Sequence, residues 1–169
     1  VGCFFRPNYE RGILIYSLIK KYNIKTFLEI GFGRGYGTIC AAKAIYENGG
    51  GKVVSVDPFL DDNHIKSVIE TFPKEWINLI RLRRGTSKKI IPTLKEDFDF
   101  VYIDGDHTED AVRFDWESTR NKFNKFLLFD DYHMPSKRQN NIECAKIVDQ
   151  IEGYNKELRK INKRNKNKY

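Results

Sequence analysis

Two kinds of apolar segment alternate along most of this 169-residue chain. Short runs rich in β-branched and aromatic residues are typical of strands, whereas longer runs with apolar residues every three or four positions are typical of helices. The predicted strands are 26–30, 52–56, 78–82, 98–104 and 125–130, and the predicted helices are 12–22, 36–48, 61–72, 87–95, 108–123 and 142–151. Parallel strands need a crossover helix between them, so this alternation predicts an α/β, doubly wound, mostly parallel sheet in three layers.

This fold class indicates where a functional site belongs. In open parallel sheets, ligands bind beyond the carboxyl ends of the strands, near the point where the strand order reverses. The residues that directly follow each predicted strand are therefore the first candidates for binding and catalysis.

A glycine-rich turn, EIGFGRGYGT at residues 29–38, follows the first predicted strand. Glycines where a strand turns into a helix let the backbone approach a ligand closely. The dinucleotide fingerprint G-x-G-x-x-G, counted from Gly31, would need a glycine where the chain has Tyr36. What remains is the pattern E-x-G-x-G-x-G, with Glu29 just before the turn.

Asp57 ends the second predicted strand, beside this turn in a parallel sheet. A carboxylate at that position can accept hydrogen bonds from both hydroxyls of a ribose. The glycine turn and Asp57 together predict a ligand that contains adenosine.

Carboxylates crowd the ends of the fourth and fifth predicted strands, which read IDGDH and FDDYH. Asp104, Asp130 and Asp131 are expected to converge there, and such close like charges repel unless they are protonated or bridged by a cation. Oxygen ligands favour Mg²⁺, Mn²⁺ or Ca²⁺, so the three aspartates are a candidate site for a divalent metal. The alternative is that Asp130 and Asp131 form a helix-capping turn without a metal.

Taken together, the glycine turn and Asp57 resemble motifs I and II of the class I S-adenosylmethionine-dependent methyltransferases, over about residues 25–135. The resemblance implies a Rossmann-like methyltransferase fold with S-adenosylmethionine as cofactor. Family members continue into a final antiparallel strand pair, which we expect to be absent here because only a short basic segment follows the last predicted helix. The implied cofactor-binding residues are Glu29, Gly31, Gly33, Gly35, Asp57, Thr86, Ser87 and Asp104.

The strand ends further resemble those of metal-dependent O-methyltransferases of the catechol, caffeoyl-CoA and macrocin types. In that family a base stands three residues beyond the aspartate of strand four, and His107 matches it. The run DGDHTEDAVRFDWE also resembles the DGDH-x-Y-E-x-x-x-x-D signature of small methyltransferases. The resemblance implies Asp104 and His107 as catalytic residues, with His107 taking the proton of a metal-bound hydroxyl. The alternative is that His107 only anchors the helix that follows it.

Composition limits the other classes of function. The net charge of +7 is concentrated in residues 155–169, which carry seven Lys or Arg and one Glu, so the rest of the chain is almost neutral. We expect a methyltransferase domain at 1–153 and a solvated basic tail at 154–169. The three cysteines form no disulfide or zinc pattern, and no apolar run could span a bilayer, so a cytoplasmic protein without a membrane partner is expected.

The predicted activity is methyl transfer from S-adenosylmethionine to a hydroxyl of a small diol, sugar or phenol. An RNA ribose O-methyltransferase and a non-catalytic cofactor-binding module are the alternatives. Nucleic acid is the less favoured partner, because IDGDH is neither the N/D-P-P-Y motif of amino-methylating enzymes nor the Pro-Cys motif of cytosine enzymes.

Overall fold

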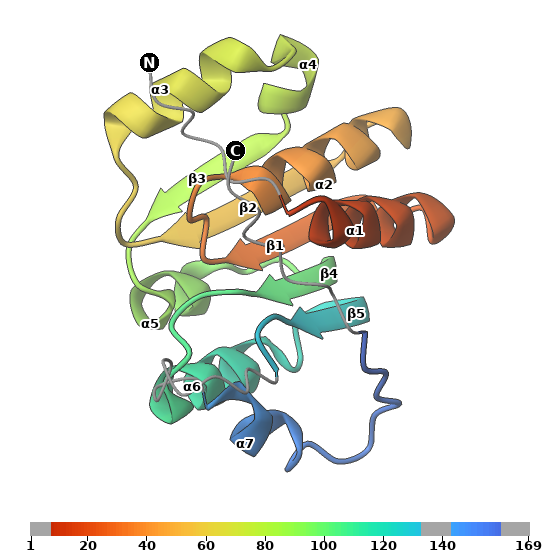
Figure 1. Ribbon diagram of the computed structural model, residues 1–169, viewed down its shortest axis with the longest axis vertical. Helices are drawn as coiled ribbons and strands as arrows, with labels where there is room; N and C mark the ends of the chain where they lie inside the picture. Colours follow the sequence, from red (N-terminus) through yellow and green to blue (C-terminus); the bar gives the residue numbers. More distant parts are fainter. Residues whose placement is uncertain (1–7, 133–142, 160–169) are drawn as a thin grey trace, which may run out of the picture.

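Five strands in the described part of the chain form one parallel sheet in the order β3-β2-β1-β4-β5, and their arrows all point the same way (Figure 1). The structure, a computed structural model, describes residues 8–132 and 143–159. The strands are β1 (Thr26–Ile30), β2 (Lys52–Asp57), β3 (Ile80–Arg84), β4 (Phe98–Ile103) and β5 (Phe123–Phe129). The strand order reverses between β1 and β4, which is where this fold class binds its ligands. The predicted doubly wound parallel sheet is confirmed.

Helices cover both faces of the sheet (Figure 1). On one face lie α1 (Tyr9–Lys21), α2 (Tyr36–Glu47) and α4 (Lys74–Ile77), with α3 (Asp62–Thr71) preceding α4. On the other lie α5 (Ser87–Ile90), the 3-10 helix η1 (Ile91–Thr93) and α6 (Glu109–Thr119), and α7 (Cys144–Val148) packs on α6. No helix in the described part of the chain combines the length and apolar character needed to cross a membrane.

The sheet has an apolar core on each face, because successive side chains along the buried strands point to opposite faces. Phe27 of β1 packs with the apolar residues of α1 and α2, whereas its neighbour Leu28 packs on the opposite face with Ile91 of η1. Glu29 then points toward the α2 side among these apolar residues and is 1% exposed. A charged group at that depth needs specific polar partners.

Several element boundaries differ from the predictions. The helix predicted at 87–95 is α5 followed by η1, because Pro92 has no N–H to continue an α-helix. The helix predicted at 108–123 ends at Thr119, and Phe123 instead pairs with Phe98 as the first residue of β5. Strand β3 begins two residues later than predicted, and α4 was not predicted.

Helix α1 begins three residues earlier than predicted, because the Asn8 side chain accepts a hydrogen bond from the Arg11 N–H at 3.2 Å and caps the helix. The helix then lies close to the start of α2. A side-chain carbon on Gly12 would lie 2.8 Å from ring carbons of Tyr36, which is closer than packed atoms approach. Glycine at position 12 therefore permits this close packing of α1 on α2.

The C-terminal part is only partly described. The helix predicted at 142–151 is α7, and Ile142 lies outside the described residues. In residues 143–159 the structure has α7 and no strand, and whether a strand pair follows β5 elsewhere stays a prediction. The Tyr154 ring packs against Trp116 with centroids 5.4 Å apart. The proposed division into a domain and a basic tail stays a prediction, because residues 160–169 lie outside the described part.

Candidate active site

The ends of the central strands meet at one edge of the sheet because the backbone ladder continues beyond each strand. The Gly31 N–H donates to the Val56 carbonyl at 2.8 Å, and the Asp104 N–H donates to the Ile30 carbonyl at 2.8 Å. The Asp130 N–H continues the series by donating to the Ile103 carbonyl at 2.9 Å. The glycine turn and the acidic residues are thus fixed side by side.

The first glycines of the turn serve two different purposes. Gly31 has a φ of +98°, and a side-chain carbon there would overlap the backbone carbonyl of Asp104. Gly33 has a φ of +52°, is exposed, and has no atom within 4 Å of the place where a side-chain carbon would be. Gly31 therefore allows two loops of the protein to touch, and Gly33 leaves the surface of the turn open.

The remaining glycines of the turn are packed against the protein itself. A side-chain carbon on Gly35 would lie 2.7 Å from the ring of Phe32, and one on Gly37 would overlap the carboxylate of Glu29. Of the four glycines, Gly33 is the one whose open side faces outward. The sequence alone did not distinguish among Gly31, Gly33 and Gly35, which were all expected to bind the cofactor.

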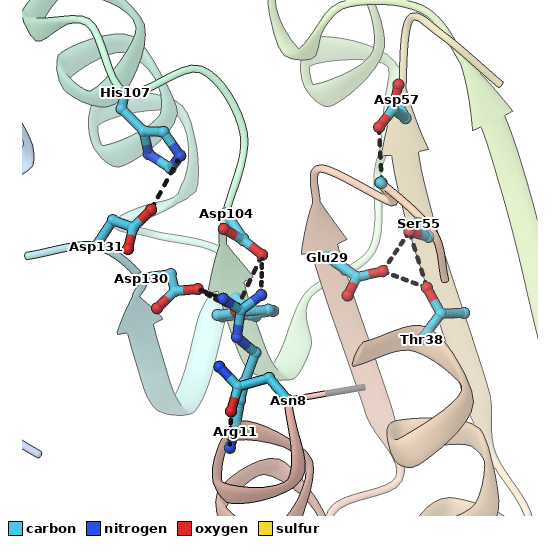
Figure 2. Close-up of polar contacts among 12 residues, drawn as sticks. Asn8, Arg11, Glu29, Thr38, Ser55, Asp57, Asp104, His107, Asp130 and Asp131 are labelled. Atoms are coloured by element: carbon cyan, nitrogen blue, oxygen red, sulfur yellow. Dashed lines mark hydrogen bonds and ion pairs between the residues drawn. The ribbon is translucent and has the colours of Figure 1, made fainter. Parts of the chain in front are cut away.

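Glu29 is buried behind the glycine turn and holds three elements together (Figure 2). Its carboxylate accepts a hydrogen bond from the Ser55 hydroxyl of β2 at 2.6 Å and another from the Thr38 hydroxyl of α2. Burial raises the pKa of Glu29 to about 7, and the two hydroxyl donors act in the opposite direction. The structure thus places this predicted cofactor residue beneath the turn, where it positions the turn.

Asp57 lies directly against the open part of the turn (Figure 2). Its Oδ2 accepts a hydrogen bond from the Gly33 N–H at 3.0 Å, and its Oδ1 accepts one from the Phe59 N–H at 2.7 Å. The Gly85 N–H donates to the Asp57 carbonyl at 3.1 Å, so the segment after β3 begins beside the same residue. The predicted ribose carboxylate and the predicted glycine loop are brought together.

Thr86 and Ser87 follow at the start of α5. Thr86 is exposed and stands at the N-cap position of α5, whereas Ser87 is half-buried. The Ser87 hydroxyl is hydrogen-bonded to Asp115 of α6, a buried carboxylate whose pKa burial raises to about 6. Of the two, Thr86 is the one that the structure leaves exposed beside Asp57, and Ser87 joins α5 to α6.

A cation from the protein lies between two of the predicted metal ligands. Figure 2 shows Arg11 reaching from α1 to the ends of β4 and β5. Its Nη1 is 2.7 Å from Oδ2 of Asp104, and its Nη2 is 2.5 Å from Oδ2 of Asp130. The Tyr102 hydroxyl lies 3.1 Å and 3.0 Å from the same two oxygens. Burial and the neighbouring Asp130 raise the pKa of Asp104, whereas Arg11 lowers it.

The third aspartate points elsewhere. Asp131 has a left-handed backbone, with a φ of +48°, and its carboxylate lies 3.5 Å from Nε2 of His107 (Figure 2). Ligand atoms of Asp104, His107 and Asp131 all lie within 4.8 Å of one another, which is the spacing of a candidate metal site. The structure thus brings Asp104 and Asp131 together with His107, while both Asp104 and Asp130 contact Arg11 and Tyr102.

Sequence reasoning missed Arg11, Tyr102 and the partners of Glu29. Arg11 could have been noticed in the sequence, because it is the third residue of a helix and the dipole of a helix places partial positive charge at its N-terminus. A cation there is unfavourable unless a carboxylate outside the helix pairs with it. Nothing in the sequence pointed to Tyr102, because an aromatic residue in a buried strand ordinarily packs in the hydrophobic core.

A parallel sheet with an open glycine turn after β1 and a carboxylate after β2 defines a nucleoside-cofactor-binding protein of the doubly wound class. A family model described as a methyltransferase domain matches residues 28–132. The chain belongs to this methyltransferase family.

Solved structures show the same fold. The O-methyltransferase TomG from Streptomyces achromogenes, in complex with SAM, is 17% identical with a TM-score of 0.67, covering 85% of this chain and 68% of TomG. Cofactor-bound Rv0187 from MTB is 16% identical with a TM-score of 0.70, and the match covers 89% of this chain and 71% of Rv0187. An O-methyltransferase from Bacillus cereus, in complex with SAH, is 22% identical with a TM-score of 0.57, and the match covers 73% of this chain and 55% of the Bacillus cereus protein. No curated protein matches the chain.

Proposed function

We propose that the protein transfers a methyl group from S-adenosylmethionine to a hydroxyl of a small-molecule acceptor. The observation that carries this proposal is the position of Asp57 and Gly33 at the same sheet edge as Asp104 and His107. Family membership supports methyl transfer, and the SAM and SAH complexes of TomG and the Bacillus cereus protein support the choice of cofactor.

In this proposal the cofactor lies across the carboxyl ends of β1 and β2. Asp57 receives the ribose hydroxyls, Gly33 leaves room for the methionine part, and Thr86 lies beside the adenine. Glu29, Gly31, Gly35 and Ser87 shape the pocket from behind, through the contacts described above. Asp104, adjacent to the turn through Gly31, borders the reacting end of the cofactor.

The chemical step needs a group that removes the acceptor's proton. The acceptor oxygen attacks the sulfonium methyl carbon, the carbon–sulfur bond breaks, and the sulfur keeps the electron pair as a neutral thioether. His107 takes the hydroxyl proton, and Asp131 orients the imidazole and stabilises its charged form. Positioning of the two reactants at one edge supplies much of the remaining rate enhancement.

A divalent cation is part of the proposal, with a ligand set that differs from the one expected from the sequence. Asp104, Asp131 and His107 would hold it, because their ligand atoms share one small region. The ion would lower the pKa of an acceptor hydroxyl. Nε2 of His107 has one lone pair, so His107 would act as the base in the metal-free protein, and with the ion bound the acidified hydroxyl would release its proton to water.

Calorimetric titration with S-adenosylmethionine and S-adenosylhomocysteine, with and without Mg²⁺, tests the cofactor assignment. Methyl transfer to a panel of vicinal diols, phenols and sugars then tests the acceptor class, with an RNA oligonucleotide included for the ribose alternative. We expect micromolar-range cofactor binding and transfer to a small hydroxyl compound. Absence of cofactor binding would refute the function, and cofactor binding with transfer only to RNA would refute the acceptor class.

A further inference from the structure

Arg11 occupies a position that the reaction proposed above does not explain. It belongs to α1, far in sequence from the strand ends, yet its guanidinium reaches carboxylates of both β4 and β5 (Figure 2). The two ion pairs use different nitrogens, Nη1 and Nη2, so one planar group spans Asp104 and Asp130. Such a two-pronged contact fixes the direction of the guanidinium as well as its charge.

The surroundings show that this contact is built into the fold. The side chains of Arg11, Asp104 and Asp130 are 26%, 19% and 15% exposed, so the pairs are shielded from solvent and poorly screened. The Tyr102 hydroxyl lies against the same carboxylate oxygens. Asn8 caps α1 one turn away, and Gly12 lets the helix approach α2, so the backbone that carries Arg11 is also fixed.

We infer that Arg11 is a built-in cation that neutralises Asp104 and Asp130 and keeps Asp130 out of the metal coordination sphere. Two carboxylates this close need a positive charge, and the guanidinium supplies it from within the chain. A divalent ion is then confined to the Asp104, His107 and Asp131 side of the cluster. Arg11 is therefore a positioning residue that selects the ligand set.

Binding of Mn²⁺ to the full chain tests this inference directly, by calorimetry or electron paramagnetic resonance and without any methyl donor. Arg11→Gln removes the charge and the two-pronged contact but keeps a polar side chain at this position. Arg11→Gln frees the Asp130 carboxylate as a further oxygen ligand, so we expect this variant to bind Mn²⁺ about tenfold more tightly or better. The double variant Arg11→Gln, Asp130→Asn should lose this gain, because the gain depends on the freed Asp130.

Two controls separate charge from folding. Arg11→Lys keeps the positive charge and should bind Mn²⁺ more weakly than Arg11→Gln, and Asp130→Asn alone should leave Mn²⁺ affinity within twofold. Unchanged Mn²⁺ affinity in Arg11→Gln, or a gain that persists in the double variant, would overturn the inference.

A second measurement uses the unchanged protein and so does not depend on whether the Arg11→Gln chain folds. An anomalous difference map from crystals of the unchanged protein grown with Mn²⁺ should show no ion bound to Asp130, and an ion coordinated by Asp130 would overturn the inference. S-adenosylhomocysteine affinity, measured in parallel, reports on the proposed function independently. Loss of cofactor binding with the Mn²⁺ pattern intact would refute that function alone.

Discussion

Gly31 lies directly against the backbone carbonyl of Asp104, so the glycine turn after β1 and the acidic loop after β4 touch without an intervening side chain. The two loops are therefore one packed unit, and what disturbs one displaces the other. This relationship distinguishes glycines that serve the fold from the glycine that faces outward.

Replacement of Gly31 and of Gly33 by alanine should give different outcomes. Gly31→Ala adds a carbon that overlaps backbone at a positive φ, so we expect a loss of about 3 kcal/mol or more in the free energy of unfolding. Gly33→Ala meets no atom within 4 Å and should cost about 1 kcal/mol, for the left-handed backbone alone. Denaturant titration measures both, and equal losses would contradict the assignment.

Gly33→Ala also tests cofactor binding separately from the stability of the fold. Under the proposed function, Gly33→Ala places a methyl group against the cofactor and should weaken S-adenosylhomocysteine affinity about tenfold or more. Calorimetry on the folded Gly33→Ala protein measures this, and unchanged affinity would show that the cofactor does not contact the turn there.

Glu29 should make stability depend on pH. Its pKa is raised by burial from 4.5 in the unfolded chain to about 7, so the native state binds a proton more strongly. The contribution of Glu29 to the free energy of unfolding is fully present below pH 4.5. It falls by about 3 kcal/mol as the pH rises through the native pKa of about 7. Glu29→Gln, which can keep contacts with Thr38 and Ser55, should lack this loss. A stability difference between the two proteins that stays constant from pH 4.5 to 8 would rule this out.

Asp57 and Asp61 offer a matched pair for the ribose site. Each carboxylate accepts a hydrogen bond from the N–H two residues later, at 2.7 Å in Asp57 and 2.9 Å in Asp61. Only Asp57 also bonds to Gly33. Asp57→Ala should weaken S-adenosylhomocysteine affinity by tenfold to a hundredfold, while Asp61→Ala should leave it within twofold. Equal affinities in the two variants would place the ribose elsewhere.

His107 and Asp131 should affect the rate of transfer and not cofactor binding. His107→Gln is expected to lower kcat by about a hundredfold to ten-thousandfold, because general-base catalysis commonly supplies that range. Asp131→Asn should lower kcat less, since it acts through His107. Asp106→Asn is the control, because Asp106 is exposed and accepts a hydrogen bond from the Thr108 N–H. A His107→Gln enzyme with an unchanged kcat would exclude this base.

The fold was largely predictable from the sequence, because strand and helix periods alternate clearly and parallel strands need helical crossovers. The misplaced boundaries have local causes, such as Pro92 ending α5 and the pairing of Phe123 with Phe98. At the site, the strand-end rule placed Asp57, Asp104 and Asp131 at one edge. It could not divide the carboxylates between partners, since that depends on the left-handed turn at Asp131 and on a helix distant in sequence.

Tight packing at Gly12 has a consequence for how related chains diverge. A side chain at position 12 would meet the ring end of Tyr36, so either that ring or α1 would have to move, and a moved α1 would carry the neighbouring Arg11 away from both strands. The two positions should be inherited as a pair, and relatives with a bulkier residue at position 12 should neutralise their acidic strand ends by other means.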